Sequence, residues 1–182
     1  MAVPGLVVLD RDGVINEDSG EFIKSVAEWR PIHGSLDAIA ALTRSGFRVA
    51  VVTNQSGVGR GLFTEKTLNE IHARMAAAVR ETGGELAAIY YCPHRPDEGC
   101  DCRKPRTALL RRLERDLGYS LARVPFIGDR LSDIDAAEAV GARAILVRTG
   151  TGAATERLIG SRSLEVFDDL ASATRSLLAQ IG

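Results

Sequence analysis

The sequence predicts a three-layer α/β fold with a Rossmann-like parallel sheet, and two observations carry this prediction. Short, β-branched apolar runs alternate along the chain with longer helical patterns. The helical patterns are long enough to be right-handed crossovers, which make neighbouring strands parallel and cover both faces of the sheet. No internal repeat or low-complexity linker interrupts the 182 residues, so we interpret residues 1–182 as a single domain.

Strands are expected where the chain forms a short run of apolar, mostly β-branched residues. The five expected strands are Leu6–Leu9, Val49–Val52, Ala88–Tyr91, Val124–Ile127 and Ala144–Val147. In such a sheet, ligands bind beyond the carboxyl ends of the strands. Asp10, Thr53, Cys92 and Asp129 each follow an expected strand, so we expect them at that edge.

Capping residues and glycines set the expected ends of the helices. A Ser or Thr hydroxyl can accept a hydrogen bond from the first turn, and a glycine can end a helix in the left-handed conformation. The expected helices run from Ser35 to near Gly46, from Thr64 to Gly83, from Leu109 to Gly118, from Asp133 to Gly141 and from Asp168 onwards. Thr149–Ser163 shows neither pattern and is interpreted as a surface connection.

Composition and charge exclude several classes of protein. With 45% hydrophobic and 26% charged residues, the chain is typical of a globular protein and unlike a disordered one. Its 23 basic and 24 acidic residues give a net charge of −1, so we expect no nucleic-acid or membrane partner. No apolar run approaches the ~20 residues of a membrane span, and Met1–Leu9 lacks the pattern of a signal peptide. The three cysteines lie between Cys92 and Cys102, unlike an export disulfide framework, so we expect a cytoplasmic protein.

Four carboxylates follow the first and fourth expected strands. Asp10 and Asp12 come after the first, and Asp129 and Asp133 after the fourth. Acids crowded at one edge repel each other, and a divalent cation with oxygen ligands, Mg²⁺, relieves that repulsion. The alternatives are a solvated Asp-Gly turn at residues 12–13 and a plain N-cap role for Asp133.

The second strand and the segment before the fourth helix supply groups that suit an anion. Thr53–Gly57 offers a hydroxyl, amides and a turn rich in backbone N–H groups, which fits phosphate. Lys104, in Arg103-Lys104-Pro105, can balance phosphate and carboxylate charge. Taken alone, the first segment is better explained as a simple loop, and the alternative for the second is a solvated surface pair.

A cluster of cysteine and histidine predicts a structural zinc site. The four candidate ligands are Cys92, His94, Cys100 and Cys102. Thiolate and imidazole ligands suit tetrahedral Zn²⁺, and four filled positions favour a structural site over a catalytic one. The alternative, core packing, is disfavoured because residues 95–99 between the ligands are polar. The metal would also fix Arg103 and Lys104, which follow the last ligand.

These segments, in this order, resemble the haloacid dehalogenase-like (HAD) phosphohydrolase superfamily over residues 6 to about 150. The matching motifs are Asp10-x-Asp12-Gly13, Thr53-Asn54, Lys104-Pro105, and Gly128-Asp129 followed by Asp133. The resemblance implies that Asp10 is a nucleophile that forms an aspartyl phosphate, and that Asp12 acts as general acid and base. It also implies that Asp10, the Asp12 carbonyl and Asp129 bind Mg²⁺. Thr53 and Lys104 would hold the phosphoryl oxygens, and Asp133 would orient Lys104 or a metal-bound water.

A narrower resemblance is to the D-glycero-D-manno-heptose 1,7-bisphosphate 7-phosphatases. The shared motifs lie at residues 10–13, 53–57, 60–61, 90–94 and 100–105. The alternative within the superfamily is a histidinol-phosphate phosphatase, which also has a zinc loop. The implied sugar-binding residues are Asp18, Ser19, Gly20 and Glu21. Asn54, Gln55 and Ser56 are candidates for binding phosphate, and Arg103 and Arg130 are candidates for the second phosphate because a planar guanidinium grips oxyanions. The alternative for Arg130 is a solvated side chain. The resemblance implies a place in lipopolysaccharide or surface-sugar synthesis.

The gaps between these motifs are too short for a separate cap domain. Residues 10–53 leave room for one helix and a loop, and 53–104 for one helix, one strand and the zinc loop. We therefore expect an open site for a small sugar phosphate, in a monomeric protein. Arg11 is interpreted as solvated or ion-paired, without a catalytic role. His33 and His72, which have no acidic or cysteine neighbours, are interpreted as structural or surface residues.

Overall fold

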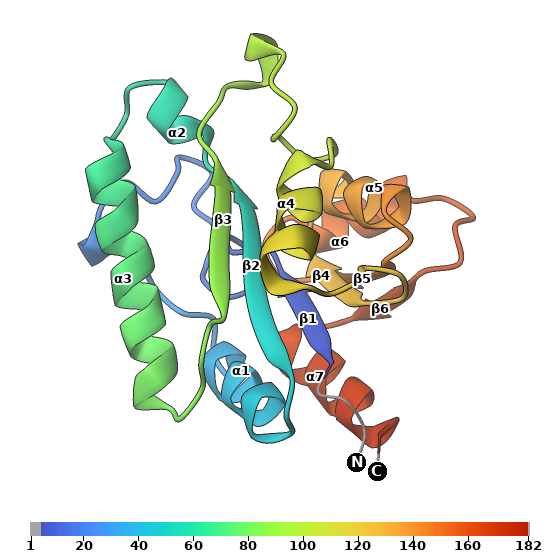
Figure 1. Cartoon of the computed structure of the whole chain (residues 1–182). Helices are drawn as coiled ribbons and strands as arrows, with labels where there is room; N and C mark the ends of the chain where they lie inside the picture. Colours follow the sequence, from blue (N-terminus) through green and yellow to red (C-terminus); the bar gives the residue numbers. More distant parts are fainter. Residues whose placement is uncertain (1–4, 182) are drawn as a thin grey trace.

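The computed structural model describes residues 5–181, and it contains a six-stranded sheet whose paired strands are all parallel (Figure 1). The strands are β1 (Leu6–Leu9), β2 (Arg48–Asn54), β3 (Ala88–Cys92), β4 (Pro125–Gly128), β5 (Arg143–Val147) and β6 (Glu165–Phe167). Their order in the sheet is β3-β2-β1-β4-β5-β6, which is the doubly wound Rossmann order. The predicted fold class is confirmed, although the sixth strand was not expected.

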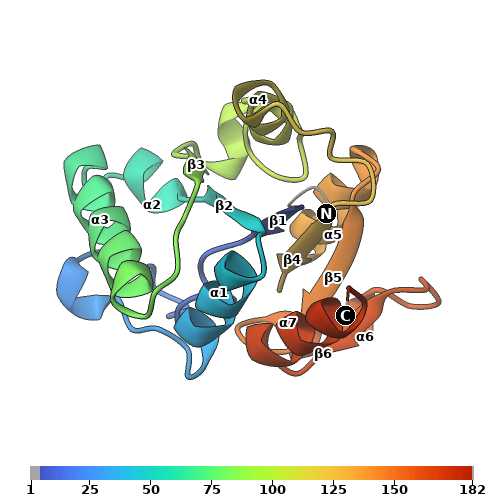
Figure 2. The same ribbon diagram turned by 60° about the horizontal axis from the view of Figure 1, so that its bottom comes forward.

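Helices cover both faces of the sheet. They are α1 (Ser35–Arg44), α2 (Ser56–Gly59), α3 (Glu65–Glu81), α4 (Ala108–Leu117), α5 (Leu131–Ala139), α6 (Gly152–Leu158) and α7 (Leu170–Ala179), with 3-10 turns at Val26–Glu28 and Pro96–Glu98. In Figure 2, α1 and α7 lie side by side on one face, and α4 lies on the other. This is the three-layer arrangement that alternating strands and helices predict.

The alternation of side chains along β1 divides the core between the two faces. Val7 and Leu9 pack into the cluster formed with α1, α3 and α7. Leu6 and Val8 point the other way, into the cluster formed with α4 and α5. All four side chains are buried, because a parallel strand inside a three-layer fold has no solvent-facing side.

One expected helix cap and one expected surface connection are wrong. Ser35 does not cap α1: the N-cap is Gly34, with φ of 79°, and the Ser35 hydroxyl donates to the Ile15 carbonyl instead. Thr64 does cap α3, accepting from the Thr67 N–H. The stretch Thr149–Ser163 is not a plain surface connection, because it contains α6 and leads into β6.

No separate cap domain is built from residues 5–181. The segment between β1 and α1 contains only the 3-10 turn, and the segment between β2 and α3 contains only the four-residue α2. Within the same residues, none of the helices is long and apolar enough to cross a lipid bilayer. Residues 1–4, part of the segment judged to lack a signal peptide, lie outside the described residues.

The strand order places the site. β1 lies at the centre, paired with β2 on one side and β4 on the other. The connection from β1 to β2 and the one that follows β4 leave in opposite directions, which opens a crevice at the carboxyl ends of β1 and β4. Asp10 and Asp129 are the first residues after these two strands.

Candidate active site

Three buried carboxylates meet at the carboxyl ends of β1 and β4. Oxygen atoms of Asp10, Asp129 and Asp133 all lie within 4.8 Å of one another. Asp133 is not a plain N-cap. It lies in the first turn of α5, where its Oδ2 accepts from the Arg130 N–H at 3.0 Å, and its Oδ1 faces into the cluster.

Lys104 is the cation of this cluster. Its side chain is 1% exposed, and its Nζ lies 3.0 Å from Asp10 Oδ1 and 2.7 Å from Asp133 Oδ1. The ammonium also donates to the Val52 carbonyl at 2.7 Å. Asn54 holds the Lys104 backbone, accepting from its N–H at 3.0 Å and donating to its carbonyl at 3.1 Å. Burial alone would lower the pKa of Lys104, but the two carboxylates raise it, so the ammonium stays charged.

The cluster has an excess of negative charge. Burial, reinforced by Asp133, raises the pKa of Asp10 from 3.8 to about 7, although Lys104 acts against the rise. Burial and Asp133 likewise raise the pKa of Asp129 to about 6. Three acids and one lysine thus share a buried site, and a divalent cation relieves the resulting excess of negative charge.

Asp129 is held by the segment after β5. Its Oδ2 accepts from the Thr151 N–H at 2.8 Å and from the Thr151 hydroxyl at 2.9 Å, and its carbonyl accepts from Thr155 at 2.7 Å. Gly13 and Gly150 close in beside it, so that a Cβ on either would lie 2.4 Å from Asp129 Oδ2. The sequence analysis did not predict these contacts with Asp129. The pattern that indicates them is the alternation of threonine and glycine at residues 149–152, shortly after β5.

The geometry at Asp129 fits a magnesium ion. The second oxygen, Oδ1, is buried and has no hydrogen-bond partner among the residues that the structure describes. An oxygen of the same carboxylate lies within 4.8 Å of oxygens of Asp10 and Asp133. Hard carboxylate oxygens that lack a donor are the ligands that Mg²⁺ prefers. The residues present therefore fit the cation that the sequence predicts.

Asp12 lies beside this cluster in a separate network of hydrogen bonds. Its Oδ1 accepts from Arg11 at 2.7 Å and from Asn16 at 2.9 Å, and its Oδ2 accepts from Gln55 at 2.8 Å. Burial would raise its pKa, but the charge of Arg11 and these hydrogen bonds outweigh that effect and lower it. Arg11 is not solvated, because its side chain is 0% exposed; the ion-pair interpretation holds. His72 lies against it, also buried.

A cleft of about 300 Å³ opens above these groups. The predicted site residues that line it are Asp10, Asp12, Asp18, Gly20, Thr53, Asn54, Gln55, Ser56, Arg103, Lys104 and Arg130. Ser19 and Glu21 do not line it; they border a neighbouring hollow. Phe22 and Ser132 line the cleft but were not singled out from the sequence, and Arg60, which also lines it, belongs to the shared motif at residues 60–61 but was given no role in the site.

Several contacts cross or border the cleft. Arg130 Nη2 lies 2.7 Å from Asp18 Oδ2, which ties the segment after β1 to the start of α5. The Arg60 guanidinium lies 5.9 Å from the centre of the Phe22 ring. Phe22 has φ of 68°, an uncommon conformation for a bulky residue that is often found at functional sites. Positive side chains therefore surround the opening, while the floor is acidic.

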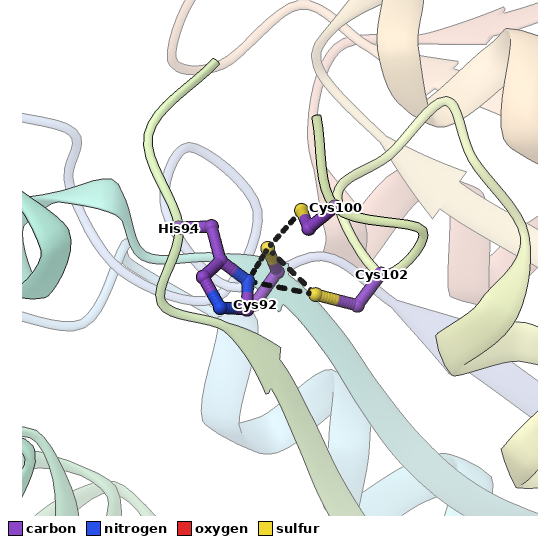
Figure 3. Close-up of side chains that lie close together, drawn as sticks. All are labelled: Cys92, His94, Cys100 and Cys102. Carbon is purple, nitrogen blue, oxygen red and sulfur yellow. Dashed lines mark hydrogen bonds between the residues drawn. The ribbon is translucent and has the colours of Figure 1, made fainter. Parts of the chain in front are cut away.

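The cysteine and histidine cluster forms at the end of β3 (Figure 3). Cys92 Sγ lies 3.6 Å from His94 Nδ1, 3.6 Å from Cys100 Sγ and 3.1 Å from Cys102 Sγ. His94 Nδ1 lies 3.2 Å from Cys102 Sγ. Four ligand atoms this close together match the spacing around a tetrahedral ion with metal–ligand bonds of about 2.0–2.3 Å. The cluster could hold a metal, as the sequence predicts.

The fold and the acidic site at the ends of β1 and β4 define a HAD-like hydrolase. A family model described as HAD-hydrolase-like matches residues 101–173. Among curated proteins, the chain is 52% identical to the D-glycero-beta-D-manno-heptose-1,7-bisphosphate 7-phosphatase of Pseudomonas putida, covering 95% of this chain and 99% of the relative. The enzyme of the same name from Pseudomonas aeruginosa is 47% identical, with 95% and 97% covered.

Solved structures agree. The crystal structure of the D,D-heptose 1,7-bisphosphate phosphatase from B. bronchiseptica, complexed with magnesium and phosphate, is 46% identical, with a TM-score of 0.94 over 97% of this chain and 99% of that one. The corresponding phosphatase from Burkholderia thailandensis is 38% identical, with a TM-score of 0.76 over 96% and 99% of the two chains. The chain belongs to the heptose-1,7-bisphosphate 7-phosphatase family of HAD hydrolases.

Proposed function

We propose that this protein removes the 7-phosphate of D-glycero-β-D-manno-heptose 1,7-bisphosphate through an aspartyl-phosphate intermediate. The observation that carries the proposal is the buried Asp10–Lys104 ion pair, 3.0 Å long, at the floor of a cleft bordered by three arginines. The names of the closely similar relatives support the same substrate and the β anomer. They give no support to the alternative, a histidinol-phosphate phosphatase.

In the first step, a carboxylate oxygen of Asp10 forms a bond to phosphorus while the bond from phosphorus to the sugar oxygen breaks. The pKa of Asp12 is lowered in the free site, but the negative charge of the bound phosphate raises it, so Asp12 enters this step protonated and gives its proton to the leaving oxygen. Thr53 and Lys104 hold the phosphoryl oxygens as charge moves onto the leaving group. Asp133 orients Lys104 through their 2.7 Å contact.

In the second step, Asp12 takes a proton from water, whose oxygen forms a bond to phosphorus. The bond between phosphorus and the Asp10 oxygen then breaks, which releases inorganic phosphate and restores the carboxylate. A single carboxyl group can serve both steps, because it gives up its proton in the first and regains one in the second.

Two metals complete the proposal. Asp10, the Asp12 carbonyl and Asp129 would hold Mg²⁺, which neutralises charge on the phosphoryl group. Cys92, His94, Cys100 and Cys102 would hold a structural zinc ion. Burial raises the pKa of the Cys92 thiol, so a cation is what makes its thiolate favourable. The zinc loop leads directly into Arg103 and Lys104, so this ion would fix both.

The charged groups around the cleft fit a substrate with two phosphates. Arg103 and Arg130 line the cleft and present planar guanidinium groups, which grip phosphate in a fork. Asn54 and Ser56 would contact the transferred phosphate, and Asp18 and Gly20 the sugar, whereas both amide hydrogens of Gln55 are already donated to Asp12 and Thr53. We further propose that the protein is a single domain over residues 1–182, monomeric and cytoplasmic, and acts in lipopolysaccharide or surface-sugar synthesis.

The direct test is release of phosphate from three substrates in parallel, with Mg²⁺ and zinc-loaded protein. They are the β and α anomers of the heptose bisphosphate, and histidinol phosphate. We expect clear preference for the β anomer. Asp10→Asn should abolish turnover of every substrate while leaving the fold intact. Preference for histidinol phosphate, or full activity of Asp10→Asn, would refute the proposal.

A further inference from the structure

Two buried polar groups near the site have no role in the mechanism above. Arg11 carries a guanidinium with no exposed surface, and His72 on α3 lies against it, with His72 Nε2 3.2 Å from Arg11 Nη1. Their positions are 61 residues apart in the sequence. Burying a full charge is costly unless it is paired and hydrogen-bonded. We therefore ask what the buried guanidinium of Arg11 does for the site.

The first clue is the direction of the hydrogen bonds at Gln55. A guanidinium only donates, and Arg11 Nη2 lies 3.1 Å from Gln55 Oε1. The amide oxygen of Gln55 must therefore face Arg11. Its NH₂ group then faces the other way, donating to Asp12 Oδ2 at 2.8 Å and to Thr53 Oγ1 at 2.9 Å.

This direction has consequences for two groups of the site. The Thr53 hydroxyl accepts from Gln55, so its own proton is left to donate to a phosphoryl oxygen in the cleft. Asp12 is held on both oxygens by donors, from Arg11 at 2.7 and 2.9 Å and from Gln55. If the Gln55 amide were reversed, its oxygen would face the Asp12 carboxylate, and its NH₂ would face the guanidinium.

His72 holds the other end of the guanidinium. Burial lowers the pKa of His72 to about 3, and the charge of Arg11 adds to this effect. The ring is therefore neutral, and its Nε2 lone pair can accept from Arg11. The ring also lies 5.7 Å from that of Tyr91, centre to centre. Helix α3 thus supplies a fixed acceptor at the back of the site.

We propose that His72 and Arg11 are positioning residues which set the direction of the Gln55 amide, and through it fix the Asp12 carboxylate and the Thr53 proton. His72 anchors Arg11, Arg11 orients Gln55, and Gln55 orients both site groups. The inference rests on the proposed function, because Asp12 and Thr53 act only if phosphate is transferred at Asp10.

The test compares His72→Leu with His72→Gln in the full-length, zinc-loaded protein. Leucine removes the acceptor, whereas the glutamine carbonyl can replace Nε2. With the heptose bisphosphate and saturating Mg²⁺, we expect kcat of His72→Leu to fall by at least about tenfold, a fraction of the ~10²–10⁴ that acid–base catalysis contributes. KM should stay within about twofold, since ground-state binding is not altered. His72→Gln should restore most of kcat.

Met75→Ala is the matched control for a loss of stability. Met75 lies one turn further along α3 and is fully buried in the core. Its truncation removes buried volume without removing any of the hydrogen bonds above, so Tm should fall while kcat stays near that of the wild type. If Met75→Ala loses as much kcat as His72→Leu at an equal fall in Tm, the effect is structural and the proposal fails.

A second variant keeps the test decisive if His72→Leu does not fold. Arg11→Lys retains the buried positive charge, but a point-like ammonium cannot bond Asp12, Gln55 and His72 together as the guanidinium fork does. The same fall in kcat at nearly constant KM is expected. Unchanged kcat in Arg11→Lys, or a His72→Gln variant as slow as His72→Leu, would overturn the inference. An inactive wild type would instead refute the proposed function.

Discussion

Replacing Asp129 by asparagine should stabilise the metal-free protein while it abolishes turnover. In the folded wild type, Asp129 Oδ1 is buried and has no hydrogen-bond donor among residues 5–181, and the Asp129 carboxylate lies beside those of Asp10 and Asp133. Asparagine has the same shape. Its oxygen can still accept from Thr151, as Oδ2 does at 2.8 Å, and its NH₂ would face the two acids as a donor. One repulsive charge is thereby exchanged for a favourable contact.

The magnitude follows from the pKa of Asp129. A carboxyl whose pKa is raised from 3.8 to about 6 is destabilised in its charged form by about 3 kcal/mol at neutral pH. Because neighbouring acids share this cost, we expect Asp129→Asn to gain about 1–3 kcal/mol, or roughly 3–10 °C in Tm for a domain of this size. Asp129 is a proposed Mg²⁺ ligand, so the variant should lose most of its activity.

The assay is thermal unfolding with and without Mg²⁺, with zinc retained on the protein. Without Mg²⁺, Asp129→Asn should melt above the wild type. At Mg²⁺ 100-fold above its Kd, the wild type should gain about 2.7 kcal/mol, and the variant almost nothing. Asp135→Asn is the control: it removes one charge from the same helix, at a half-exposed pair with Arg162, and should shift stability by less than about 1 kcal/mol. A metal-free Asp129→Asn that melts below the wild type would refute this account of the cluster.

Three further predictions follow from the same geometry. The increase in Tm of metal-free Asp129→Asn over the wild type should be complete above pH 7 and should shrink as the pH falls through about 6 towards 4. The reason is that Asp129 in the folded wild type becomes protonated over this range. An increase in Tm that does not change with pH would contradict this explanation. Cys102→Ser should reduce the zinc content measured by elemental analysis, lower Tm, and slow turnover even in excess Mg²⁺; an unchanged Tm would exclude a structural role for the metal. Arg130→Ala should raise KM for the bisphosphate by about 10-fold or more, because it removes charged hydrogen bonds to the second phosphate. KM for a heptose 7-monophosphate should stay nearly unchanged. An equal rise in KM for both substrates would exclude contact between Arg130 and the second phosphate.

The parts of the fold that depend on local pattern could be predicted from the sequence. The apolar run at Leu6–Leu9 identified a buried strand, and the acids that follow it and β4 identified the edge at which they meet. β6 was not predicted because its three residues, Glu165–Phe167, are only half-buried and too few to show a hydrophobic periodicity. α1 begins differently from expectation because Gly34, rather than a hydroxyl residue, supplies its N-cap.

The missed parts of the site depend on contacts between distant segments. The residues near Arg11 in the sequence do not predict its contact with His72, which lies in the middle of α3. Thr151 contacts Asp129 from 22 residues away, and only the sheet order brings β5 next to β4. Phe22 and Arg60 likewise come from separate loops. Residue type and spacing identify ligands and nucleophiles, whereas the groups that hold them in place emerge only from the tertiary structure.

The close packing of Gly13 against Gly150 fixes the position of the Asp129 carboxylate. A Cβ on Gly150 would lie 2.5 Å from the Gly13 Cα, and both glycines touch Asp129. Backbones this close, each with positive φ, cannot slide past one another without a clash. The turn after β1 and the segment after β5 therefore behave as one rigid floor. The Asp129 carboxylate keeps its place only while both positions remain glycine, so the precision of the site depends on two residues that contribute no functional group of their own.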